Sequence, residues 1–313
     1  MSTVVRTNLL TKDFYAGFWR PRPHRALDGL SFVIPSGGVY GLLGPNGAGK
    51  STTLKLLIDL LRPTSGSAEV LGRPAGAVEA RQRLGFLPEH PTFYDYLSAE
   101  ELLIYVAGLF GYRGAEQRQR AEKVLDRVGL AADRRRPIRQ YSKGMVQRVG
   151  LAQAIVNDPE LVILDEPMSG LDPLGRREVR EMILELRDEG RTVLFSSHIL
   201  SDAEVLCSRV GILDKGKLVA EGTIDALTTG GTRGWEIVAT DVSAALAERL
   251  KGRVARLTSI AAGRYAMELA ADGRPEQLIA DLALGGATLV SVSPIRTTLE
   301  DVFMRALGKE GAA

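Results

Sequence analysis

One segment fits the phosphate-binding pattern G-x-x-x-x-G-K-[ST]: Gly44, Pro45, Asn46, Gly47, Ala48, Gly49, Lys50 and Ser51. Glycines allow successive backbone N–H groups to turn toward one anion, and a helix beginning there adds the positive end of its dipole. We expect Lys50 to reach the outer phosphates, the Ser51 hydroxyl to ligate Mg²⁺, and Thr52 to join the nucleotide contact in the same turn. The alternative is a Gly-rich turn that fits the pattern by chance.

A second candidate is the apolar segment Leu161–Leu164, which ends in the adjacent carboxylates Asp165 and Glu166. Two carboxylates at the end of a buried strand repel each other unless a cation is present, and α/β sheets bind ligands at that edge. We expect Asp165 to hold Mg²⁺ through water and Glu166 to polarise an attacking water. By itself, such an acidic residue also fits an ordinary helix cap.

A third segment lies between these two and begins a helix: Ser142, Lys143, Gly144 and Met145. Ser142 is a typical N-cap, so the simplest interpretation is a capped helix. With this segment, however, the chain resembles the ATPase subunits of ATP-binding-cassette (ABC) transporters, whose signature is a similar S-G-G-Q-type helix start. The order of the motifs agrees with the family, since Ser169-Gly170-Leu171-Asp172 resembles its dimer-contact loop and His198 its switch histidine.

The resemblance covers roughly residues 9–221 and implies an ATPase that uses ATP and Mg²⁺. It implies catalytic roles for Glu166, His198 and Lys50, and two cassettes that close head to tail. In such a dimer the segment 142–145 of one copy faces the phosphate loop of the other. The implied partners are a second copy or a paralogous ATPase and a separately encoded transmembrane permease, so the expected location is the cytoplasmic face of the inner (plasma) membrane.

Two residues depart from the common family pattern. Glu89 stands where Gln is usual, so a carboxylate would face Mg²⁺, and Lys143 replaces a Gly, which places a cation near the opposing phosphate. The Glu89 variant and the ending Leu299–Phe303 both resemble exporter ATPases of the ABC-2, drug and polysaccharide efflux type. That resemblance implies export, docking of the permease on residues 90–96, and a regulatory or dimer-contact role for the C-terminal domain, although a stabilising appendage fits equally.

The adenine platform is expected to be an aromatic residue near the first strand, where Phe14 and Tyr15 are adjacent. Alternation along a strand places them on opposite faces, and Phe14 matches the family position better. The alternative is that Phe14 and Tyr15 are both core residues. Residues 17–25 are expected to form an exposed basic loop.

The elements expected to position these motifs form an α/β fold of the P-loop cassette type, with a mixed sheet core, an antiparallel β subdomain and a helical subdomain. Strands are expected over residues 3–11, 30–35, 39–43, 161–164 and 192–195, and helices over 51–61, 98–110, 115–128, 143–156 and 174–187. A flexible break at 228–234 suggests a nucleotide-binding domain over residues 4–228, with its helical part at about 90–158, and a small α+β accessory domain over 233–308.

Composition excludes several other classes of protein. The 313 residues are 45% hydrophobic and 25% charged with a net charge of +2, which indicates a globular protein and disfavours nucleic-acid binding. The single cysteine, Cys207, fits a reducing compartment, and no apolar run is long enough to span a membrane. The rival hypothesis is a soluble cassette ATPase that acts on DNA or the ribosome, but neither a long coiled coil nor a second cassette is present.

Overall fold

The structure is a computed structural model that describes residues 2–16, 22–228 and 232–308. The chain divides into two compact units, residues 1–224 and residues 225–313. None of the described helices combines the length and the apolar composition that crossing a bilayer requires.

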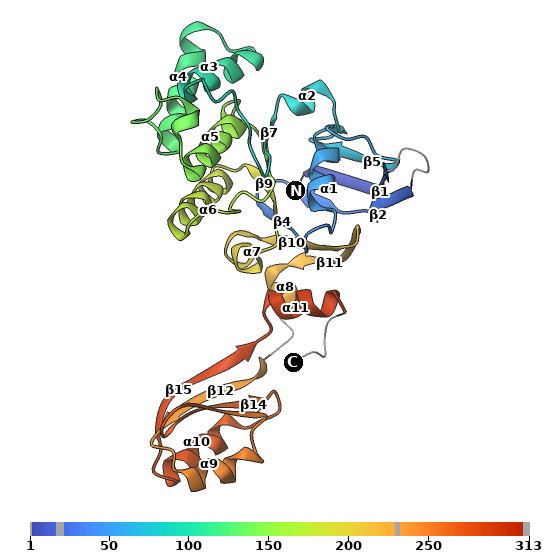
Figure 1. Cartoon of the computed structure of the whole chain (residues 1–313). Coiled ribbons are helices and arrows are strands. Elements are labelled where there is room, and N and C mark those ends of the chain that lie inside the picture. Colours follow the sequence, from blue (N-terminus) through green and yellow to red (C-terminus); the bar gives the residue numbers. More distant parts are fainter. Residues whose placement is uncertain (1, 17–21, 229–231, 309–313) are drawn as a thin grey trace. The chain divides into compact units, whose positions relative to one another are not determined.

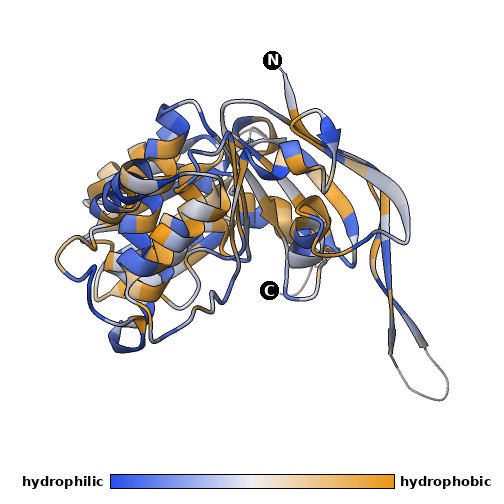
Figure 2. Cartoon of the chain, turned by 90° about the horizontal axis from the view of Figure 1, so that it is seen from above, coloured by the Kyte–Doolittle hydropathy of each residue, from blue (hydrophilic) through white to orange (hydrophobic). Residues whose placement is uncertain are grey.

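The first unit is built on a six-stranded sheet with the strand order β11-β10-β4-β9-β8-β7. Its strands are β4 (Val39–Leu43), β7 (Leu84–Leu87), β8 (Leu161–Leu164), β9 (Thr192–Ser197), β10 (Arg209–Asp214) and β11 (Lys217–Thr223). All neighbours pair in parallel except the β10–β11 hairpin, and every residue of β4, β8 and β9 is buried. Continuously apolar strands are typical of parallel sheets that are covered on both faces, and Figure 2 shows apolar residues concentrated in these strands.

A second, antiparallel sheet lies beside the first (Figure 1). Its strands are β1 (Thr3–Ala16), β2 (Arg22–Leu30), β3 (Val33–Pro35), β5 (Ser65–Val70) and β6 (Arg73–Pro74). β1 is longer than the predicted strand 3–11. The expected loop over 17–25 is wrong for residues 22–25, which belong to β2, because their backbone pairs with the extension of β1; residues 17–21 lie outside the described residues. The predicted strand 30–35 is divided between the end of β2 and β3.

Helices make up the rest of the first unit. They are α1 (Lys50–Leu57), α2 (Val78–Arg81), α3 (Ala99–Leu109), α4 (Gly114–Arg127), α5 (Lys143–Ile155), α6 (Pro173–Asp188) and α7 (Leu200–Leu206). Ser98 and Glu101 form a capping box at the start of α3, which fixes that helix where the sequence predicts it. α1 ends earlier than the predicted residue 61, since Asp59 adopts a left-handed backbone conformation with φ of 62°.

The first unit therefore has three parts: the mixed sheet, the antiparallel sheet and the helices. In Figure 1, α3, α4 and α5 lie on one side of the central strands, and β1, β2 and β5 lie on the other. The predicted α/β fold, with a mixed sheet, an antiparallel part and a helical part, is confirmed.

The second unit is a four-stranded antiparallel sheet with the order β13-β14-β12-β15. α8 (Ile224–Thr228) precedes it, and its elements are β12 (Thr232–Thr240), α9 (Ala244–Lys251), β13 (Arg256–Ala261), β14 (Arg264–Ala270), α10 (Pro275–Leu284), β15 (Thr288–Arg296) and α11 (Leu299–Ala306). From β12 to β15 this is the split βαβ arrangement of ferredoxin-like folds. The edge strand β13 was not predicted, because most of its residues are exposed and it lacks the apolar alternation of a half-buried strand.

Candidate active site

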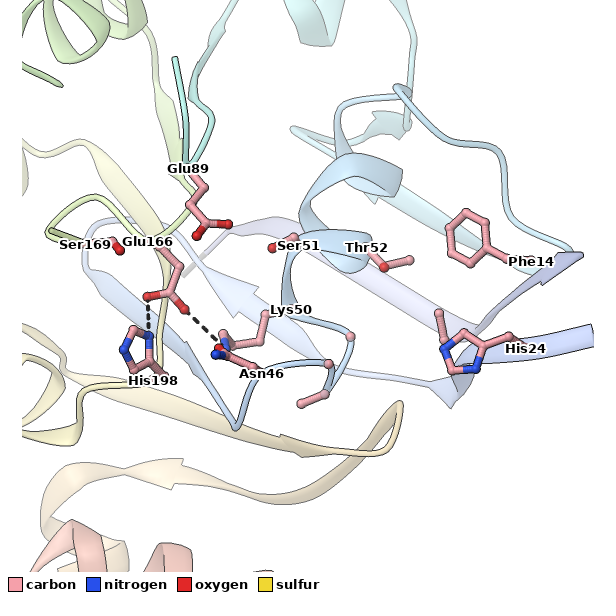
Figure 3. A pocket seen from close by; sticks show the side chains of 14 residues that line it. Phe14, His24, Asn46, Lys50, Ser51, Thr52, Glu89, Glu166, Ser169 and His198 are labelled. Carbon is pink, nitrogen blue, oxygen red and sulfur yellow. Dashed lines mark hydrogen bonds and ion pairs between the residues drawn. The ribbon is translucent and has the colours of Figure 1, made fainter. Parts of the chain in front are cut away.

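The phosphate loop, Glu166 and His198 meet at one pocket of about 470 Å³ at the carboxyl edge of the central sheet (Figure 3). β4, β7, β8 and β9 are parallel, so the loops that follow them meet at this edge. The residues that line the pocket are Phe14, His24, Ala26, Asn46, Gly47, Ala48, Gly49, Lys50, Ser51, Thr52, Glu89, Glu166, Ser169 and His198.

The loop between β4 and α1 has the backbone that an anion site requires. Gly47 and Gly49 have φ values of 80° and 107°, which other residues rarely adopt. A Cβ atom on Gly49 would lie 2.6 Å from Leu27 Cδ2 and 2.7 Å from the Ala26 carbonyl oxygen. Gly49 is also the N-cap of α1, and no side chain there accepts from the first N–H groups of that helix. These donors are therefore left for an anionic ligand.

Lys50 is the buried cation of this loop, with 6% of its surface exposed. Its Nζ donates to the Gly44 carbonyl at 2.8 Å and lies 3.2 Å from Glu166 Oε1. The ammonium is thus held by groups of this chain at the place where phosphates are expected. A phosphate ligand would replace one anionic partner of Lys50 with another.

The Ser51 hydroxyl and the Asp165 carboxylate lie together, as the sequence predicts. Ser51 Oγ donates to Asp165 Oδ1 at 3.0 Å, and Ser196 Oγ donates to the same oxygen at 2.7 Å. Burial raises the pKa of Asp165, an effect that these two hydrogen bonds oppose and the nearby charges of Glu89 and Glu166 reinforce. Ser196 also accepts from the Glu166 N–H at 2.8 Å. Sequence reasoning assigned no role to Ser196, although it directly precedes the Ser197-His198 pair.

These oxygen donors fit Mg²⁺. A hydroxyl and a carboxylate in contact, with the Glu89 carboxylate lining the same pocket, are the hard ligands that this ion prefers. Within residues 2–16, 22–228 and 232–308, no group of three or more His, Cys, Asp or Glu side chains is placed to hold a metal by itself.

The Glu166 carboxylate lies between Lys50 and His198. Its Oε2 is 2.8 Å from His198 Nδ1, on the side opposite its contact with Lys50, and the carboxylate is buried (Figure 3). Its backbone φ of 47° is left-handed, an unusual conformation for a residue with a side chain, which is typical of functional sites. A buried carboxylate oriented on both sides can accept a proton from a water molecule in the pocket.

The β1–β2 hairpin supplies the apolar end of the pocket. Phe14 is 37% exposed and lines the pocket, whereas Tyr15, the next residue on β1, is 68% exposed and does not line it. Lys12 Nζ lies 5.2 Å from the centroid of the Phe14 ring. His24 pairs with Phe14 across the hairpin and lines the pocket too, a position that sequence reasoning missed because residues 17–25 were assigned to a loop.

The signature segment is not part of this pocket. Ser142 Oγ accepts from the Met145 N–H at 3.3 Å and so caps α5, as predicted. Ser142, Lys143 and Gly144 line a separate hollow of about 320 Å³ with Gly170 and Asp172. Within one chain, the two predicted halves of the nucleotide site therefore remain apart.

Lys143→Gly is expected to keep the ATPase rate within tenfold of the wild type. The Lys143 ammonium packs over Gly170, where an added Cβ atom would lie 1.9 Å from Nζ, so removing the lysine side chain opens space without breaking a side-chain hydrogen bond among the described residues. The measurement is phosphate release at saturating MgATP. A larger loss, above about 1.4 kcal/mol of barrier, would show that this cation acts directly on the opposing phosphates.

Comparisons with known proteins identify the family to which this site belongs. Residues 27–169 match the family model described as ABC transporter. The chain is 41% identical over 312 residues to an uncharacterized ABC transporter ATP-binding protein of Synechocystis, which covers 99% of this chain and 86% of that one. It is 40% identical over 230 residues, 72% of each chain, to the bacitracin transport ATP-binding protein BcrA of Bacillus licheniformis. Over 205 residues, 65% of this chain and 62% of the relative, it is 41% identical to the daunorubicin/doxorubicin resistance ATP-binding protein DrrA of Streptomyces peucetius.

Solved structures give the same result. The dimeric cassette MJ0796 with bound ADP and Pi matches with a TM-score of 0.64 and 26% identity, over 70% of this chain and 98% of that one. The expected family and ATPase activity are confirmed, and the rival hypothesis of an ATPase acting on DNA or the ribosome is not favoured. A phosphate loop facing two strand-end carboxylates, together with relatives that match nearly the whole chain, shows that this protein belongs to the ABC transporter ATP-binding proteins and is an ATPase subunit of the exporter type.

Proposed function

We propose that the chain binds ATP with Mg²⁺ in the 470 Å³ pocket and hydrolyses it to drive export through a separate membrane permease. The observation that carries the proposal is the meeting of three groups: the phosphate loop, the Ser51–Asp165 pair and the Glu166–His198 pair. In this assignment the nucleotide-binding residues are Gly44 to Thr52 with Phe14, and the metal site is Ser51, Asp165 and Glu89. Bound Mg²⁺ would neutralise charge on the phosphate oxygens.

The chain's own groups would divide the chemistry among them. Lys50 leaves Gly44 and Glu166 to bind the outer phosphates, which frees the Glu166 carboxylate to take a proton from the attacking water. His198 holds Glu166 in position through its Nδ1 contact and faces the same pocket. Oriented donors of this kind stabilise the charge that develops on the transferred phosphoryl group.

We propose that a second cassette completes the site. Residues 142–145 lie outside the pocket of their own chain, and the N-terminus of α5 carries backbone donors that an opposing phosphate would satisfy. Either a second copy of this chain or a paralogous ATPase would serve, bound head to tail. ATP then forms part of the interface, and its hydrolysis reopens the pair.

The permease would dock on the helical part of the first unit. Phe93, Tyr94, Leu102, Tyr105 and Val106 line a hollow of about 410 Å³, and Tyr94 and Tyr105 are 61% and 55% exposed. Exposed aromatic residues around a hollow are typical of protein interfaces. We place the assembly at the cytoplasmic face of the inner membrane, with residues 233–308 as an accessory domain.

Phe93→Glu and Tyr94→Glu are expected to abolish stimulation of the ATPase by the permease while the basal rate stays the same, because each places a charge in an apolar contact. The measurement compares MgATP hydrolysis by the purified chain with hydrolysis by the chain reconstituted with its permease. Leu60→Glu is the matched control, since Leu60 is exposed but does not line this hollow. Stimulation that survives both changes would contradict this docking site.

We propose no nucleic-acid partner. In the sheet of the second unit, on the face that does not carry the apolar core, Glu236 of β12 pairs directly with Glu268 of β14. Arg256 lies 4.0 Å from Glu268, so these three side chains carry no excess of positive charge of the kind that binds a phosphate backbone. Relatives are named for daunorubicin resistance, bacitracin transport and Nod factor export. These names favour an ATPase that serves export over one that acts on DNA or the ribosome.

A further inference from the structure

Two ring-bearing side chains lie on the same face of the hairpin at the apolar end of the pocket. Phe14 of β1 and His24 of β2 are direct partners in the antiparallel register, and both line the pocket. Directly opposite residues in such a pair share one face of the sheet, with Cβ atoms about 4.5–5.5 Å apart. Figure 3 shows both side chains extending from the hairpin toward the phosphate loop, with Thr52 beside them. A flat ligand above this face would therefore meet both rings.

The surroundings leave the imidazole of His24 available. Among the residues that the structure describes, the His24 side chain forms no hydrogen bond and no ion pair. Its neighbour Arg25, by contrast, is held by Asp13 at 2.8 Å and Asp28 at 3.0 Å. An exposed imidazole beside an aromatic ring offers one donor and one acceptor nitrogen next to a stacking surface.

Phe14 is similarly open on one side. Lys12 lies over its ring at 5.2 Å from the centroid, and the Lys12 ammonium is held there by a 2.8 Å hydrogen bond to the Arg62 carbonyl. One face of the ring thus carries a cation, and the ring is otherwise free to stack in the pocket that it lines. Stacking of a base on an aromatic ring stabilises a bound nucleotide.

We propose that His24 is a second base-binding residue that makes the site selective for purines. A purine has two fused rings and can stack on Phe14 while its far edge reaches the imidazole, whereas a pyrimidine has one ring and contacts only one of the two side chains. The inference rests on the proposed ATP site and adds to it the residue that sets base preference. The loop around Lys50 still binds the phosphates.

The test measures nucleotide affinity of the full chain by calorimetry in EDTA, which prevents hydrolysis. His24→Ala is expected to raise the Kd for ATP about five- to tenfold, to change the Kd for CTP less than twofold, and to leave inorganic tripolyphosphate binding unchanged. Phe14→Ala is expected to weaken both nucleotides. Tyr15→Ala is the matched control, because Tyr15 is exposed on the other face of β1 and lines no part of the pocket.

Three outcomes separate the possibilities. An ATP affinity within twofold of the wild type in His24→Ala, with Phe14→Ala weakened as expected, overturns the role of His24 alone. Equal losses for ATP, CTP and tripolyphosphate overturn it too, since they show a disturbed pocket rather than a lost base contact. If the wild-type chain binds no ATP, both the inference and the proposed function fail.

Discussion

Glu166→Gln is expected to reduce ATP hydrolysis at least about 10³-fold, within the range that a general base contributes. The amide keeps the size of the side chain, but it cannot take a proton from water. The substitution also removes the negative charge that lies 3.2 Å from Lys50 Nζ and 2.8 Å from His198 Nδ1. The measurement is steady-state phosphate release by the purified protein at saturating MgATP.

The same variant is expected to accumulate as an ATP-bound dimer, because binding proceeds and the step that reopens the pair does not. Light scattering with and without MgATP measures the change in mass. Glu181→Gln is the matched control, since Glu181 is an exposed carboxylate of α6 that pairs with Arg177 away from the pocket. A monomer at saturating MgATP would contradict the head-to-tail mechanism, and a rate above a tenth of the wild type would contradict the role of Glu166.

Lys50→Met is expected to weaken ATP binding about 100-fold, or ~2.7 kcal/mol, as loss of one partner of a buried charge pair typically does. Met fills much of the same volume, so the loop packing is retained while the cation that would meet the outer phosphates is removed. The change also leaves Glu166 with His198 as its remaining close partner. Calorimetry with ATP in EDTA measures the affinity.

The control for this change lies one turn and a half along the same helix. Lys55 is exposed in the last turn of α1, so Lys55→Met removes an equal charge without touching the pocket. ATP affinity within threefold of the wild type in Lys50→Met would show that the backbone donors of the loop bind the phosphates without the lysine. A matching drop in both variants would instead indicate a general effect of net charge.

Much of the fold follows from local signals in the sequence. Ser98 with Glu101 begins α3, Ser142 begins α5, and the continuously apolar strands β4 and β8 are found at their predicted residues. Caps and apolar periodicity are properties of a few neighbouring residues, so they can be recognised without knowing what the segment packs against.

Other elements depend on contacts that are distant in the sequence. The beginning of β2, residues 22–25, looks like part of a basic loop, because it becomes a strand only by pairing with the extension of β1. The strands β10 and β11 were not predicted, and the edge strand β13 carries too few apolar residues to be recognised. A strand is defined by its partner, and a partner is chosen by the whole fold.

The sequence by itself determined the chemistry of this protein: the phosphate loop with Lys50 and Ser51, and the carboxylates Asp165 and Glu166. Residue types, their spacing and their order are enough for this, because the loop and the strand end each act within a few residues of chain. Only the tertiary structure decided which groups meet. It placed Ser196 on Asp165 and His24 opposite Phe14, since hydrogen bonds across a sheet and the register of a hairpin are set by packing rather than by local sequence.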